Sequence, residues 1–458
     1  MQHHFHPTIL REYDIRGIVG ETLFAADAAA IGRAFGTLVA RAGGNRLVCV
    51  GYDGRLSSPE LEAALVDGLV STGMEVRRVG RGPTPMLYYA AHTMQAGGGI
   101  MVTGSHNPPT HNGFKMVLGG KPFFGEQIAE LGRLNAAGAV TTAPGGTVVE
   151  APLRDSYIRR LLADYDGRRP LSVVWDAGNG ATGEVMTALA AALPGTHHLL
   201  NADIDGRFPA HHPDPTEPEN LVQLIDAVTA RGADLGIAFD GDGDRIGVVD
   251  AKGRILWGDQ MMMLLAEDVL ASRPGAPILA DVKASQSLFD RIEALGGRPV
   301  MCRTGHSLIK TRLAETGAPL AGEMSGHLFF ADRYYGYDDA LYAAVRFIGL
   351  VARWPDTTLA ERYDALPRMY NTPELRIACA EERKFAVVGE VKRRLAGSGA
   401  RVCDIDGVRV STDDGWWLLR ASNTQAVLVA RCESDSPQGL DRLRGILSRQ
   451  LAESGLSL

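Results

Sequence analysis

Three carboxylates stand at every second position of one segment, at Asp240, Asp242 and Asp244, directly after the apolar run LGIAF. Glycines between them free the backbone, so the three side chains can converge on one hard divalent cation. An EF-hand would need a glycine at its sixth position and a glutamate at its twelfth, and this segment has neither. Three uncompensated carboxylates repel one another, so we favour a Mg²⁺ site, with room for a phosphate oxygen, over a plain acidic turn.

Ser105 lies in a second polar segment, TGSHNPPT (103–110), which follows the apolar run GIMV. Glycine and proline make this segment a turn that could present the serine as a nucleophile on a rigid loop. The pattern is not the G-x-S-x-G elbow of esterases. Because a serine hydroxyl is a weak nucleophile unless something activates it, a plain turn is an equally open interpretation of this segment alone.

Glu323, Ser325 and His327 form a third group, in the glycine-bounded segment GEMSGH (322–327). A carboxylate, a hydroxyl and an imidazole side by side can hydrogen-bond adjacent hydroxyls of a sugar. A loop with a capping glutamate is the alternative.

Arg420, Ser422, Asn423 and Thr424 form the fourth group, directly after the run WWLL. A guanidinium fork with several small donors in one loop can bind a phosphate. The alternative is a turn into a helix, with Ser422 as its N-cap.

Weaker signals lie at Lys283, at the segment Thr304-Gly305-His306 and at Tyr13 and Arg16. Taken singly, a solvated lysine or a buried, satisfied histidine is the better interpretation of such residues.

Short apolar runs that end in polar turns predict buried strands around Val50, Trp175, Phe239 and Ala280. Stretches with apolar residues at helical spacing separate them; they cover residues 26–41, 59–72, 221–231, 260–272 and 284–295. Alternating strands and helices predict an α/β fold with buried, mostly parallel strands. In such sheets ligands gather at the carboxyl ends of the strands, which is where the polar segments begin.

Linker-like composition at residues 141–147, 250–254 and 363–373 predicts four domains. We place them at residues 1–148, 149–251, 252–366 and 367–458. The first three open with similar strand-turn segments, which suggests a repeated α/β unit. The last mixes one helix with strands and predicts a smaller α+β domain, so that each domain contributes one of the four polar loops.

Composition excludes several function classes. The 458 residues contain 47 Lys+Arg and 54 Asp+Glu, a net charge of −7, which argues against non-specific binding to nucleic acid or to an anionic membrane. The 5 cysteines are scattered and form no C-x-x-C pair, which favours a reducing cytoplasm. No stretch approaches the roughly 18 apolar residues of a membrane span.

The motifs TGSHNPP, DGDGDR, GEMSGH and RASNTQ, in this order, resemble the α-D-phosphohexomutase family, and most closely its bacterial phosphomannomutase/phosphoglucomutase branch. The resemblance covers nearly the whole chain. It implies three similar α/β domains and a smaller fourth one around a central cleft, and an enzyme that interconverts hexose 1-phosphate and hexose 6-phosphate. Met324 resembles the mannose/glucose subgroup, with glucosamine 1-phosphate as the alternative substrate.

The resemblance also implies a role for each matching residue. Ser105 would be the phosphoserine that donates and recovers the phosphoryl group, and its phosphate would bind Mg²⁺ with the aspartates of DGDGDR. The reaction would pass through a hexose 1,6-bisphosphate, which would also serve as activator. The implied catalytic groups are Ser105, Lys115 as general base, His306 as general acid, and Arg245. The implied substrate-binding residues are Tyr13, Arg16, Lys283, Gly305, Glu323, Ser325, His327, Arg420, Ser422, Asn423 and Thr424.

Three further expectations complete the sequence-based interpretation. The protein would work in the cytoplasm on phosphosugars, as a monomer or a weak homo-oligomer. A metal-dependent sugar phosphatase is the second enzymatic interpretation, although a hydrolase would gain nothing from a second phosphate site. A sugar-phosphate-binding module would retain that site and have no use for an activated serine.

Overall fold

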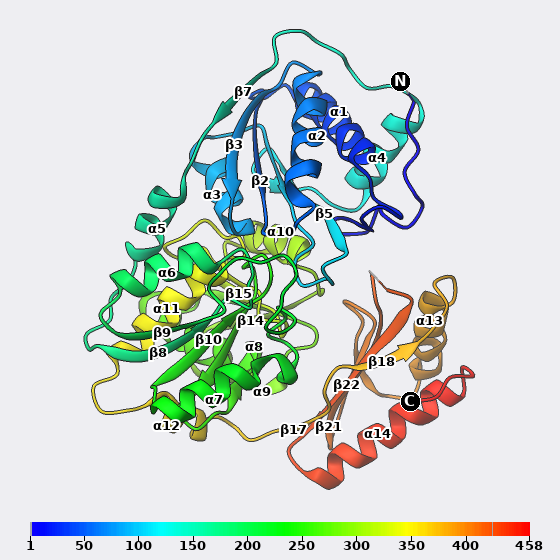
Figure 1. Ribbon diagram of the computed structural model, residues 1–458. Coiled ribbons are helices and arrows are strands. Elements are labelled where there is room, and N and C mark those ends of the chain that lie inside the picture. The colour runs from blue at the N-terminus through cyan, green and yellow to red at the C-terminus, as the bar shows by residue number, and fades with distance from the viewer. Residues whose placement is uncertain (1, 424) are drawn as a thin grey trace.

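The computed structural model describes residues 2–423 and 425–458, and Figure 1 shows three α/β domains with a fourth domain at one side. Domain I contains β1 (Ile15–Ile18), α1 (Ala25–Arg41), β2 (Leu47–Tyr52), α2 (Ser58–Val70), β3 (Glu75–Arg81), α3 (Thr84–Thr93), β4 (Gly98–Val102), β5 (His111–Leu118), β6 (Lys121–Pro122), α4 (Glu126–Ala136) and β7 (Thr147–Glu150). Its strand order is β1-β5-β4-β2-β3-β7, with β6 paired to β5. The strands β2, β3, β4 and β7 are parallel, and β5 is antiparallel to β4.

Domain II repeats this arrangement. It contains α5 (Arg154–Leu162), β8 (Leu171–Asp176), α6 (Gly183–Ala192), β9 (Gly195–Leu200), the 3₁₀ helix η1 (Pro218–Leu221), α7 (Val222–Arg231), β10 (Leu235–Phe239), β11 (Ile246–Asp250) and β12 (Ile255–Leu256). The order is β12-β11-β10-β8-β9. Residues 250–254, expected to be a linker, instead form the turn between the antiparallel strands β11 and β12. The Asp250 carboxylate closes this turn by accepting hydrogen bonds from the backbone of Lys252 and Arg254.

Domain III contains α8 (Gly258–Ser272), β13 (Pro277–Asp281), α9 (Gln286–Ala294), β14 (Arg298–Cys302), α10 (His306–Thr316), β15 (Leu320–Gly322), β16 (Leu328–Phe330), α11 (Ala340–Arg353) and α12 (Leu359–Asp364). Its order is β14-β13-β15-β16. The same order of four strands therefore recurs as β5-β4-β2-β3, β11-β10-β8-β9 and β16-β15-β13-β14. In each unit the connection from the second strand of this order to the first, its antiparallel neighbour, carries a polar motif: residues 103–110, 240–245 and 323–327.

Domain IV is built differently. It contains β17 (Tyr370–Asn371), β18 (Leu375–Ala378), α13 (Lys384–Leu395), β19 (Arg401–Cys403), β20 (Val408–Thr412), β21 (Gly415–Ala421), β22 (Val427–Ser434) and α14 (Pro437–Ala452). Its strands pair antiparallel in the order β17-β22-β21-β20-β19, with β18 also on β22. The expected fold class, three similar α/β domains and a smaller α+β domain, is confirmed.

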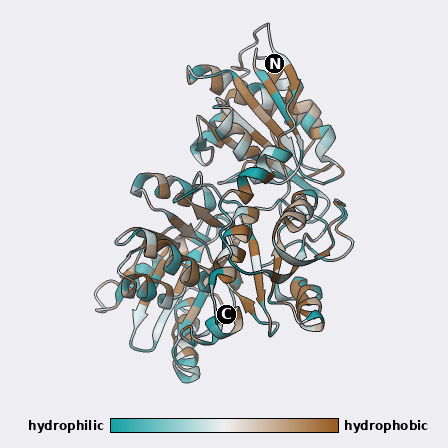
Figure 2. Cartoon of the chain, turned by 90° about the vertical axis from the view of Figure 1, so that its left-hand side faces the viewer, coloured by the Kyte–Doolittle hydropathy of each residue, from teal (hydrophilic) through white to brown (hydrophobic). Residues whose placement is uncertain are grey.

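Apolar side chains fill the space between sheets and helices, and Figure 2 shows the hydrophobic colour along the strands and the inner helix faces. One large core joins domains II and III to the α3 face of domain I and includes most of α11, whose residues from Ala340 to Ala352 are buried. Domains I and IV have cores of their own. Within residues 2–423 and 425–458, the helices lack the length and apolar character that a membrane crossing requires.

Candidate active site

The Ser105 loop and the acidic loop face each other across the junction of domains I and II. Ser105 is 2% exposed, has a φ of 49°, and donates a hydrogen bond from Oγ to Asp240 Oδ2 at 2.8 Å. A Cβ atom at Gly241 would lie 2.3 Å from the Ser105 carbonyl oxygen, so only glycine fits there. The two loops therefore pack backbone against backbone, and the serine hydroxyl points at the carboxylates.

Asp240, Asp242 and Asp244 converge as the sequence predicts. All three are fully buried, and one carboxylate oxygen of each lies within 4.8 Å of the others. Asp240 Oδ1 accepts hydrogen bonds from the backbone of Gly243, Asp244 and Arg245 at 3.0, 3.0 and 3.1 Å, which fixes the turn. Burial, and then the neighbouring aspartates, raise the pKa of Asp240 well above its usual value.

The free oxygens of this group fit a hard divalent cation. Asp242 Oδ1 and Asp244 Oδ1 are buried, and neither has a hydrogen-bond partner among the described residues. Buried carboxylate oxygens without a partner are costly, and all-oxygen donor sets suit Mg²⁺. The acidic loop could therefore hold a metal ion.

Lys115 and two threonines bind the remaining carboxylate oxygens. Lys115, on β5, is buried, and its Nζ lies 2.7 Å from Asp242 Oδ2 and also contacts Asp244. Burial opposes the charge on Lys115, but Asp242 and Asp244 outweigh it and raise its pKa. Thr84 and Thr103 both donate hydrogen bonds to Asp242 Oδ2. The sequence-predicted base is thus a cation in contact with the acidic loop.

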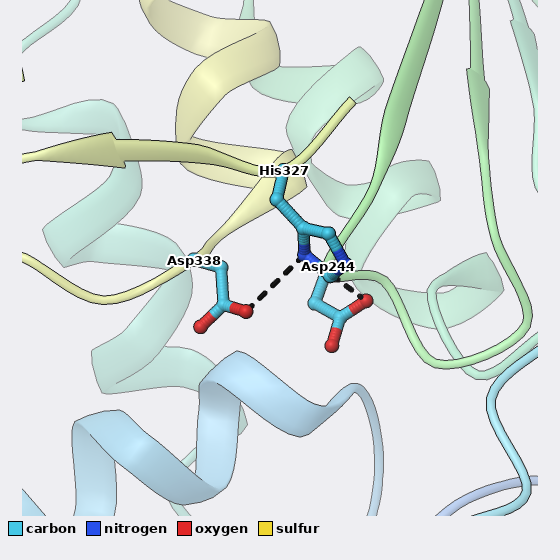
Figure 3. Close-up of side chains that lie close together, drawn as sticks. All are labelled: Asp244, His327 and Asp338. Atoms are coloured by element: carbon cyan, nitrogen blue, oxygen red, sulfur yellow. Dashed lines mark ion pairs between the residues drawn. The ribbon is translucent and has the colours of Figure 1, made fainter. Parts of the chain in front are cut away.

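His327 lies between Asp244 and Asp338, as Figure 3 shows. Its Nε2 accepts a hydrogen bond from Arg245 Nε at 3.0 Å, so Nδ1 is the nitrogen that would carry the proton whenever the ring is neutral. Nδ1 lies 3.2 Å from Asp338 Oδ2 and 3.7 Å from Asp244 Oδ1. Domains II and III therefore meet through a histidine whose two nitrogens both face charged groups.

His306 begins α10 and stacks on His327 with ring centroids 5.5 Å apart. Its Nδ1 lies 3.4 Å from Asp338 Oδ2, and Lys310 donates to the other oxygen of the same carboxylate at 2.8 Å. Burial, followed by the charge of Lys310, lowers the pKa of His306. Asp338 thus links the two histidines of the site.

Glu323 and Ser325 lie next to this pair. Ser325 Oγ donates to Glu323 Oε2 at 3.4 Å, and the Gly305 backbone N–H donates to Glu323 Oε1 at 2.6 Å. Burial opposes ionisation of Glu323, but His327 and Lys283 lower its pKa. The loop thus presents an ionised acceptor beside a hydroxyl, as expected for a group that binds sugar hydroxyls.

Residues near the N-terminus contact loops of domains I, III and IV. Tyr13 donates from its hydroxyl to the Thr304 carbonyl at 3.0 Å and accepts a hydrogen bond from Asn423 Nδ2 at 2.6 Å, so it joins domains I, III and IV. Burial raises the pKa of Tyr13 to about 12. Arg16 pairs with Asp14 at 2.8 Å and donates to Asn107 of the serine loop. Tyr13 and Arg16 therefore lie beside the loops of domains I, III and IV, and their role in binding substrate stays a prediction.

The predicted phosphate-binding cations are each paired with a carboxylate. Lys283 Nζ lies 3.0 Å from Glu374 Oε2, and Arg420 Nε donates to Asp406 Oδ2 at 2.9 Å. Asp406 also accepts a hydrogen bond from the Thr304 backbone, which ties domain IV to domain III. The cations are held in place by groups that an anionic ligand could replace.

The loop that follows Arg420 joins the antiparallel strands β21 and β22. This hairpin excludes the alternative in which Ser422 caps a helix. The predicted binding residue Thr424 lies outside the described residues.

Sequence reasoning missed Asp338, Glu374 and Asp406, which orient the histidines and the two cations. Each stands in a segment without a recognised motif: YDDA, TPEL and DIDG. Their one shared signal is an acidic residue in a short polar stretch, which is too common to single out. Asp281 was also missed. Its carboxylate accepts hydrogen bonds from Thr304 Oγ1 and from the Met324 backbone, and so connects two of the predicted polar segments.

Comparison with known protein families gives four consecutive matches. Residues 7–137, 155–253 and 257–370 match phosphoglucomutase/phosphomannomutase alpha/beta/alpha domains I, II and III, and residues 374–449 match the C-terminal domain of the same family. The matches follow the order of the four loops.

Relatives match over nearly the full chain. The chain is 45% identical over 452 residues to a phosphomannomutase/phosphoglucomutase of Pseudomonas aeruginosa, covering 98% of this chain and 97% of the relative. It is 43% identical to a phosphoglucomutase of Neisseria gonorrhoeae, covering 95% of each. A crystal structure of a phosphoglucomutase/phosphomannomutase family protein from Burkholderia thailandensis superimposes with a TM-score of 0.93 at 43% identity, covering 99% of this chain and 100% of that one. The chain belongs to the phosphoglucomutase/phosphomannomutase family.

Proposed function

We propose that this isomerase interconverts the 1-phosphates and 6-phosphates of mannose and glucose through a phosphoserine at Ser105. One observation carries the proposal: the Ser105 hydroxyl donates to Asp240, within the acidic loop that could hold a metal ion. The names of the relatives, phosphomannomutase/phosphoglucomutase and phosphoglucomutase, support mannose and glucose as the sugars.

Phosphorylated Ser105 starts the cycle as phosphoryl donor. Its O–P bond breaks and Ser105 Oγ takes up a proton from an acid, while a new O–P bond forms to the free 1- or 6-hydroxyl of the substrate, whose proton passes to a base. The product of this step is a hexose 1,6-bisphosphate. After the sugar turns round, Ser105 Oγ gives its proton to a base and forms an O–P bond to the other phosphoryl group, and the freed sugar oxygen takes up a proton. Lys115 and His306 are the proposed base and acid of these steps. Asp242 and Asp244 raise the pKa of Lys115 in this structure, so Lys115 could act as base only after a cation took its place on these carboxylates and it released its proton.

We assign Asp240, Asp242 and Asp244, with a phosphate oxygen on Ser105, as the ligands of Mg²⁺. When bound, Mg²⁺ would neutralise negative charge on the phosphoryl group during its transfer. Arg245 lies beside this loop and donates to His327, so its positive charge also faces the transferring group.

The turning of the intermediate demands a site that accepts the sugar both ways round. Glu323 offers two acceptor oxygens to sugar hydroxyls, with Ser325 and His327 next to it, and Gly305 positions one of those oxygens. The phosphate that is not reacting would bind far from Ser105. Its proposed ligands are Lys283, Arg420, Ser422, Asn423 and Thr424, with Tyr13 and Arg16 at the approach to the site.

Several finer points stay predictions. They are the activating role of hexose 1,6-bisphosphate, the cytoplasmic location, the monomeric or weakly oligomeric state and the four domain boundaries.

Phosphorus NMR tests the proposal. The purified protein is incubated with Mg²⁺, a trace of glucose 1,6-bisphosphate and, in separate tubes, mannose, glucose or glucosamine 1-phosphate. We expect the first two to give 6-phosphates without inorganic phosphate, and Ser105→Ala to lower kcat by about 10³-fold or more while ligand binding is retained. Release of inorganic phosphate would indicate a phosphatase. Near-normal turnover by Ser105→Ala would contradict the phosphoserine mechanism.

A further inference from the structure

Arg55 makes an unusual set of contacts beneath the serine loop. It follows β2 in the segment YDGR, and it is 2% exposed. Its Nη1 donates to the carbonyl oxygens of Pro108 and His111 at 2.6 and 2.9 Å. Its Nη2 donates to the carbonyl oxygens of Ser105 and Asn107 at 2.7 and 2.5 Å. One guanidinium therefore holds four carbonyl groups of a single loop.

Asp53 orients this guanidinium and holds the same loop. Its Oδ2 lies 3.2 Å from Arg55 Nε and accepts a hydrogen bond from the Gly104 backbone at 3.2 Å. Its Oδ1 accepts hydrogen bonds from the Arg55 backbone and from Ser58 Oγ. A buried arginine needs a counter-charge and acceptors for its donors. Asp53 supplies the counter-charge, and the loop carbonyls accept hydrogen bonds from both terminal nitrogens.

The loop fits closely around Arg55. A Cβ atom at Gly104 would lie 2.5 Å from Arg55 Nε, so the guanidinium occupies the space that a side chain would take. On the other side, the Phe208 ring centroid of domain II lies 5.1 Å from the Arg55 guanidinium carbon. These contacts leave the guanidinium little freedom to rotate.

Ser105 needs such support because its backbone has a φ of 49°, a region that residues other than glycine seldom adopt. A strained conformation persists only where the surroundings over-determine it. Arg55 binds the Ser105 carbonyl itself, and the same carbonyl packs against Gly241 of the acidic loop. Any rotation of the Ser105 backbone would therefore break a contact on both sides.

We propose that Arg55, oriented by Asp53, is a positioning residue that fixes the strained backbone of Ser105 so that its Oγ faces the acidic loop. This role rests on the proposed function, in which Ser105 carries the phosphoryl group. The sugar and phosphate loops belong to domains III and IV, so loss of Arg55 should slow phosphoryl transfer and leave substrate affinity nearly unchanged.

The test compares Arg55→Lys with wild type. Lysine keeps the positive charge but has no planar fork for four carbonyl groups. Because a misplacement of about 1 Å can cost roughly 10²-fold in rate, we expect kcat to fall by about 30- to 300-fold, with KM within about twofold. Hydrogen–deuterium exchange should rise in peptides covering residues 103–111 and stay unchanged in peptides covering residues 323–327.

Arg346→Lys is the matched control. Arg346 is also buried and binds Asp332 through both terminal nitrogens at 2.9 and 2.8 Å, in α11 and away from the serine loop. The Arg346→Lys variant should be less stable than wild type and have an unchanged kcat. If Arg55→Lys does not fold, Asp53→Asn replaces it, since this variant keeps the guanidinium and loosens its orientation.

Three outcomes would overturn the proposal: unchanged kcat in folded Arg55→Lys, unchanged exchange at residues 103–111, or failure of both variants to fold. Failure of both variants to fold would mean that Arg55 and Asp53 are needed for the stability of the whole domain, rather than for the position of the serine loop. Failure of the proposed function is separately visible, because it would appear as turnover by Ser105→Ala while the exchange result still reports on the loop.

Discussion

The two halves of the site hold their functional groups in different ways. On the side of domains I and II, fixed contacts to the backbone hold the groups: Asp240 accepts three backbone N–H groups, and Arg55 binds four carbonyls around Ser105. On the side of domains III and IV, and among the described residues, Lys283 pairs with the Glu374 carboxylate and Arg420 with the Asp406 carboxylate. The first kind of contact is independent of ligand, whereas the second competes with it.

This difference matches what the proposed mechanism requires of each half. In that mechanism, groups that transfer a phosphoryl must be placed before the reaction, since their geometry sets the rate. Groups that hold the other phosphate would bind the proposed intermediate and then release it so that it can turn round. When no phosphate is bound, the carboxylates of Glu374 and Asp406 pair with Lys283 and Arg420. They keep these cations oriented and compensate their charge. Changes on the first side should therefore act on kcat, and changes on the second side on KM.

After the loss of Ser105 itself, the largest effect should come from Asp242→Asn. Asp242 Oδ1 is buried and lacks a hydrogen-bond partner among the described residues, so the substitution removes a charge that a cation would meet. We expect kcat to fall by about 10²-fold or more and the Mg²⁺ concentration for half-maximal activity to rise. A magnesium titration of activity measures both.

Asp250→Asn is the control for that variant. Asp250 is equally buried, but its oxygens bind the Lys252 and Arg254 backbone and the Arg254 side chain in a turn outside the site. It should leave the magnesium titration unchanged. An unchanged titration for Asp242→Asn would instead mean that DGDGDR is a structural turn.

A smaller effect, on KM, should follow Arg420→Ala. A hydrogen bond to a charged group contributes about 1.5–3 kcal/mol, which corresponds to a KM about 10- to 100-fold higher for both 1-phosphates and 6-phosphates. Steady-state kinetics in both directions measures it. Arg442→Ala removes an exposed arginine of the same domain that pairs with Asp414, and it should leave KM unchanged. A change confined to kcat would assign Arg420 to the chemistry instead.

The sequence predicted the fold class, the centres of the α/β helices and the composition of the four loops. Helices expected at residues 26–41 and 260–272 are α1 (Ala25–Arg41) and α8 (Gly258–Ser272), because their apolar periodicity follows the buried face. The acidic loop was predictable because repulsion among three adjacent carboxylates is a local property. The turn at residues 250–254 was not distinguished from a linker, because both need the same polar and flexible residues.

The supporting residues could not be predicted because their role depends on partners that are distant in sequence. Asp338 meets His306 and His327 only after β15, β16 and α10 have packed, and Arg55 meets the serine loop only once β2 and β4 lie side by side. The local sequence of either residue is an ordinary polar turn. The motif residues could be predicted because each motif places several reactive side chains within a few consecutive positions. The residues that orient them stand singly and far away in the sequence.

The smallest predicted effect has the opposite sign. Glu374→Gln removes the carboxylate that competes with phosphate for Lys283, so KM should fall by about two- to fivefold, with kcat nearly unchanged. The control is Glu381→Gln, which removes an exposed partner of Lys384 on the same domain and should leave KM as in wild type. A higher KM for Glu374→Gln would mean that Glu374 orients Lys283 for the ligand rather than competing with it.

The same variant carries a pH signature that identifies the pair as its cause. Lys283 lowers the pKa of Glu374 to about 2, against the effect of burial, from an ordinary value of 4.5. A carboxylate whose pKa is depressed on folding contributes stability above its unfolded pKa, and this contribution is lost as pH falls through the folded pKa. Wild type should therefore be more stable than Glu374→Gln at pH 7, and the difference should shrink as pH falls below about 4.5. Urea unfolding of domain IV between pH 7 and pH 3 measures it. A difference that is constant with pH would show that packing, rather than the ion pair with Lys283, connects Glu374 to domain III.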